Sequence, residues 1–290
     1  MPPSNLTRSV LWMVGALLSF SLMAVSIREL ASHGLSIVSI LGIRAGGALV
    51  VLSALLVARP ELLAYVRPRR PWLHLLRNGI HFASQMAWAT GLTILPLAMV
   101  FALEFTMPAW TILLAPLMLR ERLSASRIGV VVLGLAGVLV ILRPGIASVN
   151  PAAFLVLIAA LGYALTNITT KMLTATETTF GIIFSMMAIQ LPLALALTDL
   201  SVYRLMTVAD IAPALCVVAG GLFSHYCMTN AFRAGDAMVV VPLDFLRIPL
   251  IAVVGWVLYR EALDIFVLIG AVIIIAGVMW NLRAESAARR

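Results

Sequence analysis

The sequence predicts an all-α membrane protein with ten transmembrane helices, arranged as two inverted five-helix repeats with both termini in the cytoplasm. Three observations favour this fold: the apolar composition, the placement of basic residues, and a match between the two halves. Of 290 residues, 62% are hydrophobic and 11% are charged, and the mean hydropathy is +1.08. A soluble domain of this length needs more charge to cover its surface. The net charge is +8, but the basic residues lie between apolar stretches, so they do not indicate a nucleic-acid-binding face.

Apolar stretches of about 20 residues recur along the whole chain, and each is long enough to cross a hydrocarbon core of roughly 30 Å. Gly and Pro mark many of their ends. The expected helices are 9–30, 36–57, 72–95, 97–118, 126–142, 152–171, 179–197, 210–232, 237–258 and 265–282.

The basic residues predict the orientation. With ten helices and the amino terminus inside, thirteen Lys and Arg residues fall in cytoplasmic segments and four in outer segments. This asymmetry follows the positive-inside rule and predicts a multi-pass protein of the bacterial inner membrane.

The two halves of the sequence match each other at charged positions. A shift of 140 residues lays Glu104 on Asp244 and the pair Arg120-Glu121 on Arg260-Glu261, and a shift of 143 lays Arg28 on Lys171. Five helices per half is an odd number, so the second repeat enters the membrane from the opposite side. The expected repeats are 9–142 and 152–282, and inverted repeats place a substrate site near the midplane in many transporters. An old duplication kept only for packing is the alternative.

Each half has a Pro-bearing fourth helix that leads into a Gly-rich fifth helix, as "LMLRERLSASRIGVVVLGLAGVLVI" and "WVLYREALDIFVLIGAVIIIAGVMW". These segments, with Glu121 and Glu261, resemble the EamA domains of the drug/metabolite transporter superfamily over almost the whole chain. Within it, the chain is similar overall to YddG-like exporters of aromatic and other amino acids. The resemblance implies that helices 1, 3, 4, 6, 8 and 9 surround a central cavity.

Four ionisable residues inside spans are candidates for gating or coupling, because charge within a bilayer is costly. Glu104 lies about seven residues into its helix, roughly 10 Å deep at 1.5 Å per residue. Asp244 is expected equally deep from the opposite face, so that one carboxylate lies near each mouth of the path. Arg247 follows Asp244 by three residues, a spacing that permits an ion pair, and Arg44 is expected to reach Glu104. Charges that only hold the helices together are the alternative reading.

Polar stripes on two symmetry-related helices predict the substrate wall. A polar stripe on a helix in the membrane must face protein or water. Hydrogen bonds between helices without any ligand are the alternative. The candidate substrate-binding residues are His81, Ser84, Gln85, Trp88, Tyr163, Asn167, Ser224 and His225.

The expected function is export of small metabolites by alternating access, with neutral and aromatic amino acids as the expected substrates. Multidrug efflux and import of a nutrient or cofactor precursor stay open, as do a membrane-embedded enzyme and a structural or sensory protein. No nucleotide loop, zinc spacing or nucleophile elbow occurs, so we expect no catalytic residues, metal or cofactor. The expected partners are a small-molecule substrate and the lipid bilayer, with no nucleic acid. Gly-rich helices predict close helix contacts, either within the monomer or in a homodimer.

Overall fold

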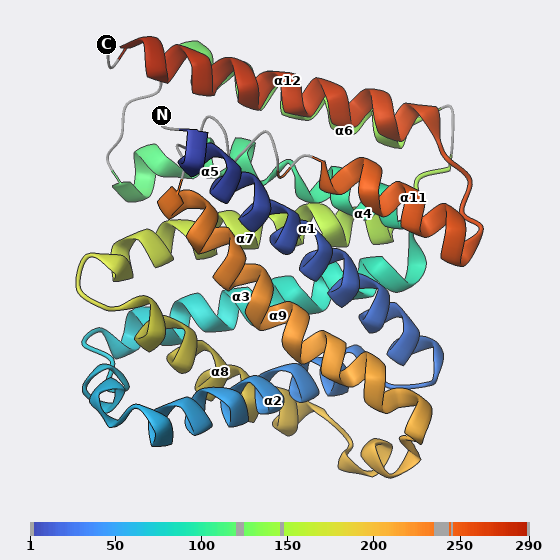
Figure 1. Ribbon diagram of the computed structural model, residues 1–290. Helices are drawn as coiled ribbons and strands as arrows, with labels where there is room; N and C mark the ends of the chain where they lie inside the picture. The colour runs from blue at the N-terminus through green and yellow to red at the C-terminus, as the bar shows by residue number, and fades with distance from the viewer. Residues whose placement is uncertain (1–2, 120–124, 146–147, 235–243, 245, 289–290) are drawn as a thin grey trace.

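The computed structural model describes residues 3–119, 125–145, 148–234, 244 and 246–288, and its regular structure in these ranges is helical (Figure 1). The helices are α1 (Pro3–Ser32), α2 (Ile37–Ala58), α3 (Pro71–Ile94), α4 (Leu97–Glu104), α5 (Met107–Leu119), α6 (Ala125–Leu142), α7 (Ala152–Thr174), α8 (Thr179–Leu197), α9 (Val208–Ala234), α11 (Arg247–Tyr259) and α12 (Ile265–Ala288). Two short 3₁₀ helices, Pro60–Tyr65 and Leu200–Leu205, follow α2 and α8.

Six helical stretches of the described chain are long and apolar enough to cross a bilayer. They are Val10–Ser32, Ile37–Ala58, Leu97–Leu114, Ala152–Leu173, Thr179–Leu197 and Val208–Met228. Three further apolar helices are shorter, at Ile128–Leu142, Arg247–Tyr259 and Ile265–Asn281. The 24-residue α3 is long enough as well, but it carries the polar stripe, so its hydropathy is low. The number of ten spans and the cytoplasmic termini stay predictions.

One expected helix is broken in the structure. The range 97–118 was expected to be continuous, but α4 ends at Glu104 and α5 begins at Met107. Pro108 explains the break, because a proline ring clashes with the carbonyl four residues earlier, here that of Glu104, and supplies no N–H. The expected helix 237–258 is described only at residue 244 and from 246 onward, with α11 starting at Arg247.

The second helix of each half begins in the same way. The Ser36 side chain accepts a hydrogen bond from Ser39 N at the start of α2, and the Thr178 side chain accepts one from Gly181 N at the start of α8. A hydroxyl at this position satisfies one of the free N–H groups of a first helical turn. These caps fix the starts of two helices that hold the same place in the two halves.

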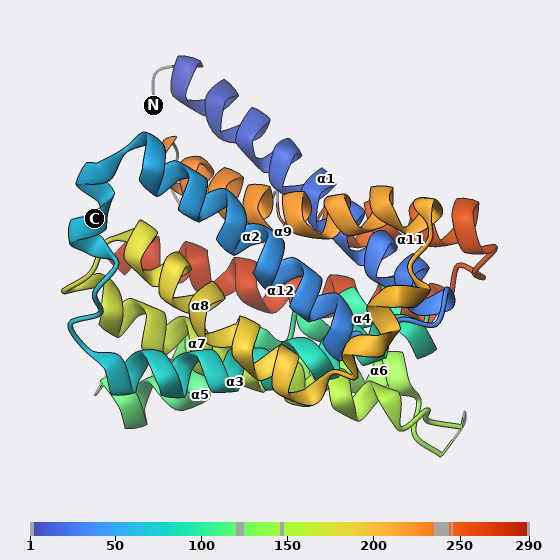
Figure 2. The same cartoon turned by 90° about the horizontal axis from the view of Figure 1, so that it is seen from below.

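The helices pack in pairs that join the two halves of the chain. Helix α1 packs on α9, α3 on α7, α2 on α8, and α6 on α12. Figure 1 shows α2 and α8 at one end of the molecule and α6 with α12 at the other, with the α1–α9 and α3–α7 pairs between them. Figure 2 views the molecule from the end where α2 and α8 lie. Exchanging the halves turns α1–α9 into α7–α3 and leaves the other two pairs unchanged, as two repeats would require. The inverted orientation of the second repeat stays a prediction.

The Gly-rich helices α6 and α12 touch each other within the monomer. A Cβ on Gly137 would lie 2.7 Å from the carbonyl oxygen of Gly270, and a Cβ on Gly270 would lie 2.6 Å from that of Gly137. Only glycine permits this backbone approach. The glycines of this pair are therefore explained by intramolecular packing, and the homodimer stays a prediction.

Candidate functional site

A cavity of about 480 Å³ lies between the two halves. This volume is in the range of sites that hold small metabolites. Residues from α1, α2, α3, α4, α5, α7, α9 and α11 line it, together with Asp244. The polar and aromatic lining residues are Phe20, Arg44, Arg77, His81, Gln85, Trp88, Glu104, Phe105, Tyr163, Thr166, Asn167, Thr170, His225, Asp244 and Arg247. Ten of the twelve side chains that the sequence singled out are among them.

Ser84 and Ser224 are the two expected site residues that lie outside this lining. Ser84 Oγ donates to the carbonyl of Ile80 at 2.7 Å, and Ser224 Oγ donates to that of Gly221 at 3.2 Å. Each precedes a residue that does line the cavity, and consecutive residues of an α-helix point about 100° apart. Both serines are therefore satisfied by their own helix.

Arg247 bridges the two carboxylates at the cavity. Its Nη2 atom lies 2.9 Å from Asp244 Oδ2, as the i,i+3 spacing predicted, and its Nη1 atom lies 3.7 Å from Glu104 Oε1. Glu104 also accepts a hydrogen bond from Trp88 Nε1 at 2.8 Å. The expected pairing of Arg44 with Glu104 is wrong, and so is the placement of one carboxylate at each mouth. The break after α4 brings Glu104 towards α11. The similar depths expected for Glu104 and Arg44 in the membrane do not reveal this direction.

Aromatic rings enclose the Arg247 guanidinium. Its Cζ atom lies 4.5 Å from the ring centroid of Phe20, 5.0 Å from that of Phe105 and 5.4 Å from that of Phe101. Cation–π contacts of a desolvated guanidinium are worth about 2 kcal/mol. The rings and the two carboxylates hold this cation within the cavity wall.

A second polar group is built around Arg44. Its Nη2 atom donates to Gln85 Oε1 at 2.8 Å and to Gln190 Oε1 at 2.7 Å, and Gln190 Nε2 lies 3.1 Å from His81 Nδ1. The site residues expected from the sequence do not include Gln190. A lone amide in an apolar span was the available signal, but its partners lie on α2 and α3, far away in sequence.

Arg77 extends this group towards α7. Its Nε atom donates to Thr170 Oγ1 at 3.1 Å, and its Nη1 atom donates to Asn78 Oδ1 at 2.6 Å. Arg44 and Arg77 are 2% and 7% exposed, so both guanidinium groups are buried. The ion pairs of the described residues leave these two arginines with neutral partners only.

Aromatic side chains form much of the remaining wall. The His81 and Tyr163 ring centroids lie 5.7 Å apart and those of Phe20 and His225 lie 6.2 Å apart, both edge to face. Asn167 is exposed and also lines the cavity, so the cavity reaches the surface on the side of α7 where this residue lies.

Comparison with known proteins identifies the family. The model of the EamA-like transporter family matches residues 7–143 and again 150–283. The chain belongs to the EamA-like transporter family. A riboflavin transporter of Rhizobium johnstonii is 30% identical over 98% of this chain and 93% of that protein. An S-adenosylmethionine uptake transporter of Rickettsia prowazekii is 27% identical over 76% of this chain and 74% of that protein.

More distant comparisons agree on the fold. A riboflavin transporter of Vibrio cholerae is 25% identical over 96% of this chain and 94% of that protein. A solved crystal structure superposes with a TM-score of 0.63 at 17% identity, covering 98% of this chain and 99% of that chain. The family match and the transporter relatives identify this EamA-like protein as a multi-pass transporter of small metabolites in the bacterial inner membrane, and not an enzyme.

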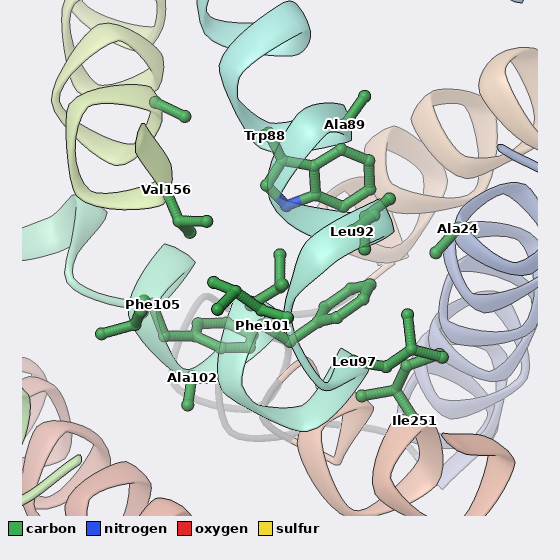
Figure 3. Packing of buried hydrophobic residues seen from close by; sticks show 14 of the residues in the cluster. Ala24, Trp88, Ala89, Leu92, Leu97, Phe101, Ala102, Phe105, Val156 and Ile251 are labelled. Atoms are coloured by element: carbon green, nitrogen blue, oxygen red, sulfur yellow. The ribbon is translucent and has the colours of Figure 1, made fainter. Parts of the chain in front are cut away.

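An apolar layer closes the transporter cavity on one side. Figure 3 shows Leu92, Leu97, Phe101 and Ile251 packed below Trp88. These four side chains are fully buried. The layer follows directly after the cavity along α3, because Trp88 and Ala89 line the cavity and Leu92 comes one turn later.

Arg28 ties this closed side together. The residue before it, Ile27, lines the cavity. The Arg28 guanidinium donates to the carbonyls of Leu92, at 2.6 Å, and Leu95, and pairs with Glu261. Glu261 Oε2 also accepts a hydrogen bond from Leu97 N at 2.8 Å. This Arg28 cluster joins α1, the turn between α3 and α4, and the segment after α11.

The chain after α11 turns sharply to place Glu261. Arg260 adopts the left-handed conformation with φ of 54°, and Glu261 N donates to Gly255 O at 3.2 Å. A non-glycine residue in this conformation costs of order 1 kcal/mol or more. A Cβ on Gly255 would overlap the Glu261 carboxylate, so a larger residue there would displace this carboxylate from Arg28 and Leu97.

Proposed function

We propose that this transporter takes up an acceptor-rich heteroaromatic metabolite, with riboflavin as the first candidate. The observation that carries the proposal is the cavity, which combines aromatic walls with two buried arginines bound to neutral partners. The rings suit a flat heteroaromatic solute, and the guanidinium groups suit its carbonyl oxygens. The similarity to a riboflavin transporter over nearly the full length of both chains supports the same substrate class.

The charge of the cavity separates the candidate substrates. Three arginines line it against two carboxylates, and both carboxylates already face Arg247. A sulfonium cation such as that of S-adenosylmethionine would enter a site with an excess of positive charge, which is unfavourable at low dielectric. A neutral or anionic heteroaromatic substrate meets no such cost.

For the transport cycle we propose alternating access between the repeats 9–142 and 152–282. The Arg28 cluster and the apolar layer close one side, while Asn167 lies at the open side. With the termini in the cytoplasm, as the positive-inside rule predicts, the open side faces inward. Arg44, Glu104, Asp244 and Arg247 would then rearrange between the states.

Uptake into proteoliposomes tests the substrate. Purified protein is reconstituted and supplied with labelled riboflavin, S-adenosylmethionine, phenylalanine, tryptophan or threonine, with and without a pH gradient. The proposal expects saturable riboflavin uptake that exceeds the other four. Transport of the amino acids alone would instead favour the amino-acid export predicted from sequence, and transport of S-adenosylmethionine alone would contradict the charge argument.

A further inference from the structure

Gln190 lies on α8 behind the cavity wall but contacts two of its residues. It is 1% exposed, its Oε1 atom accepts from Arg44, and its Nε2 atom faces His81 Nδ1. The Arg44 side chain also donates to Gln85 Oε1. Four polar side chains from α2, α3 and α8 therefore form one connected network.

The hydrogen-bond polarity of this network follows from Arg44. A guanidinium has only N–H donors, so both glutamine oxygens must accept from it. The Gln190 amide group that faces His81 is then NH₂, and His81 Nδ1 must accept. A neutral His81 therefore carries its proton on Nε2. The Gln85 oxygen accepts from Arg44, and Gln85 is also a hydrogen-bond partner of His81. The N–H groups of the Gln85 amide are therefore what Gln85 can offer a ligand.

On the Arg77 side of the cavity, too, the neighbouring acceptor atoms are occupied by an arginine. Thr170 Oγ1 accepts from Arg77 and donates its own proton to the Thr166 carbonyl at 2.6 Å. Asn78 Oδ1 accepts from Arg77 as well. The acceptors next to Arg77 are thus occupied, and the guanidinium contributes further donors.

One donor of the network has no acceptor in the protein. Arg44 Nε is buried without a hydrogen-bond partner among the described residues. Leaving a buried charged donor unsatisfied is unfavourable, and a ligand oxygen would relieve the cost. Arg44 lines the cavity, so a ligand oxygen at this end is one acceptor that would satisfy the donor.

We propose that this end of the cavity is a donor-rich subsite, formed by Arg44, Arg77 and the Gln85 amide, for two ring carbonyl or carboxylate oxygens of the substrate, and that Gln190 is the positioning residue that sets its polarity. The proposal rests on the proposed function and adds to it which end of the substrate is recognised. A ligand that presents amino groups here would face two guanidinium groups and the Gln85 N–H groups, so it would bind less well than one that presents oxygens.

The tautomer of His81 tests the role of Gln190 without any ligand. Gln190→Glu keeps an acceptor for Arg44 but has no N–H for His81, so His81 Nδ1 must then carry a proton. ¹⁵N NMR of histidine-labelled protein in nanodiscs reads this directly, with the His81 signals assigned by their loss in His81→Phe. Wild type should show Nε2 protonated and Nδ1 bare, and Gln190→Glu should show Nδ1 protonated. Ser185→Ala, a buried polar site on the same helix, should leave the wild-type pattern. If His81 Nδ1 already carries a proton in the wild type, the proposed role of Gln190 is overturned.

Ligand probes test the subsite. Thermal stabilisation of the purified protein is measured with lumichrome, which carries ring carbonyls, with 3-phenylpropionate, and with 2-phenylethylamine. Lumichrome or 3-phenylpropionate should stabilise wild type, with about tenfold weaker apparent affinity in Gln190→Glu, and 2-phenylethylamine should not. Stabilisation by the amine alone, by none of the probes, or equally in both proteins would overturn the subsite. Failure of riboflavin uptake together with stabilisation by 3-phenylpropionate would reject the proposed substrate and keep the subsite.

Discussion

Replacing Arg28 with alanine removes the cation around which the closed side is assembled. The change deletes hydrogen bonds to two backbone carbonyls and the ion pair with Glu261. It also deletes the contact with Tyr259, whose ring centroid lies 4.7 Å from Arg28 Cζ. We expect the closed side to open more often.

The structure sets the size of this effect. The Arg28 and Glu261 side chains are 13% and 17% exposed. Exposed ion pairs contribute about 0–1 kcal/mol, whereas breaking a buried pair costs about 3–5 kcal/mol. This pair lies closer to the buried case, so we expect a loss of about 3 kcal/mol of closed-state stability. Such a loss raises the population of the open state by roughly a hundredfold.

Cysteine labelling measures this population. Ala89→Cys places a thiol at the cavity, next to the apolar layer, after the native Cys216 and Cys227 have been replaced. A membrane-impermeant maleimide is added from the closed side of oriented vesicles. We expect Arg28→Ala to raise the labelling rate at least tenfold.

Arg143→Ala is the matched control. Arg143 also pairs with a carboxylate, that of Asp264, and stacks on a ring, but its partners lie outside the Arg28 cluster. It should leave the labelling rate unchanged. An unchanged rate in Arg28→Ala, in protein that still folds, would refute the role of the Arg28 cluster in closure.

Three further changes have defined outcomes. Gly137→Leu should lower the unfolding temperature in detergent, since it forces α6 away from Gly270 at a cost of about 1–3 kcal/mol or more; an unchanged temperature would contradict the close packing. Trp88→Phe removes the donor to the partly buried Glu104 carboxylate and should destabilise the protein by about 1.5–3 kcal/mol in the same assay, and no loss would show that this bond contributes nothing. The hydrogen bond from His33 to Asp210 raises the pKa of His33, which lies outside the apolar spans. A raised folded-state pKa stabilises the protein below pH of about 6.5, and the gain disappears as pH rises through the folded-state pKa; His33→Asn should therefore lose stability at pH 6 but not at pH 9, and an equal loss at both would count against the linkage.

The helices and the cavity wall were largely accessible from the sequence. Apolar length and Gly or Pro at the ends placed most helices, because a span must satisfy its backbone internally. Polar residues within the spans identified the cavity wall. Exposing side chains such as Gln85, His225 and Asn167 to lipid is unfavourable, so they were expected to face the protein interior. Pro108 predicts a break in the regular hydrogen bonding of the fourth helix, but not that the expected range 97–118 divides into two helices.

Contacts between helices were not accessible in the same way. Glu104 and Arg44 share a depth in the membrane, but rotation about each helix axis decides their partners, and that rotation depends on packing across both halves. The pair Arg28–Glu261 spans 233 positions of the chain, so no local pattern announces it. Ser84 and Gln85 are equally polar neighbours, and only the helix geometry separates a lining residue from a satisfied one.

The central claim is that the cavity between the halves is the substrate site, and two neighbouring pairs of residues test it most directly. Riboflavin uptake is measured for Gln85→Ala against Ser84→Ala, and for His225→Ala against Ser224→Ala, at matched protein levels in proteoliposomes. Gln85 and His225 line the cavity, whereas both serines bond to their own helices. The account predicts that uptake falls strongly in the first member of each pair and stays near wild type in the second. Equal uptake within both pairs would contradict it.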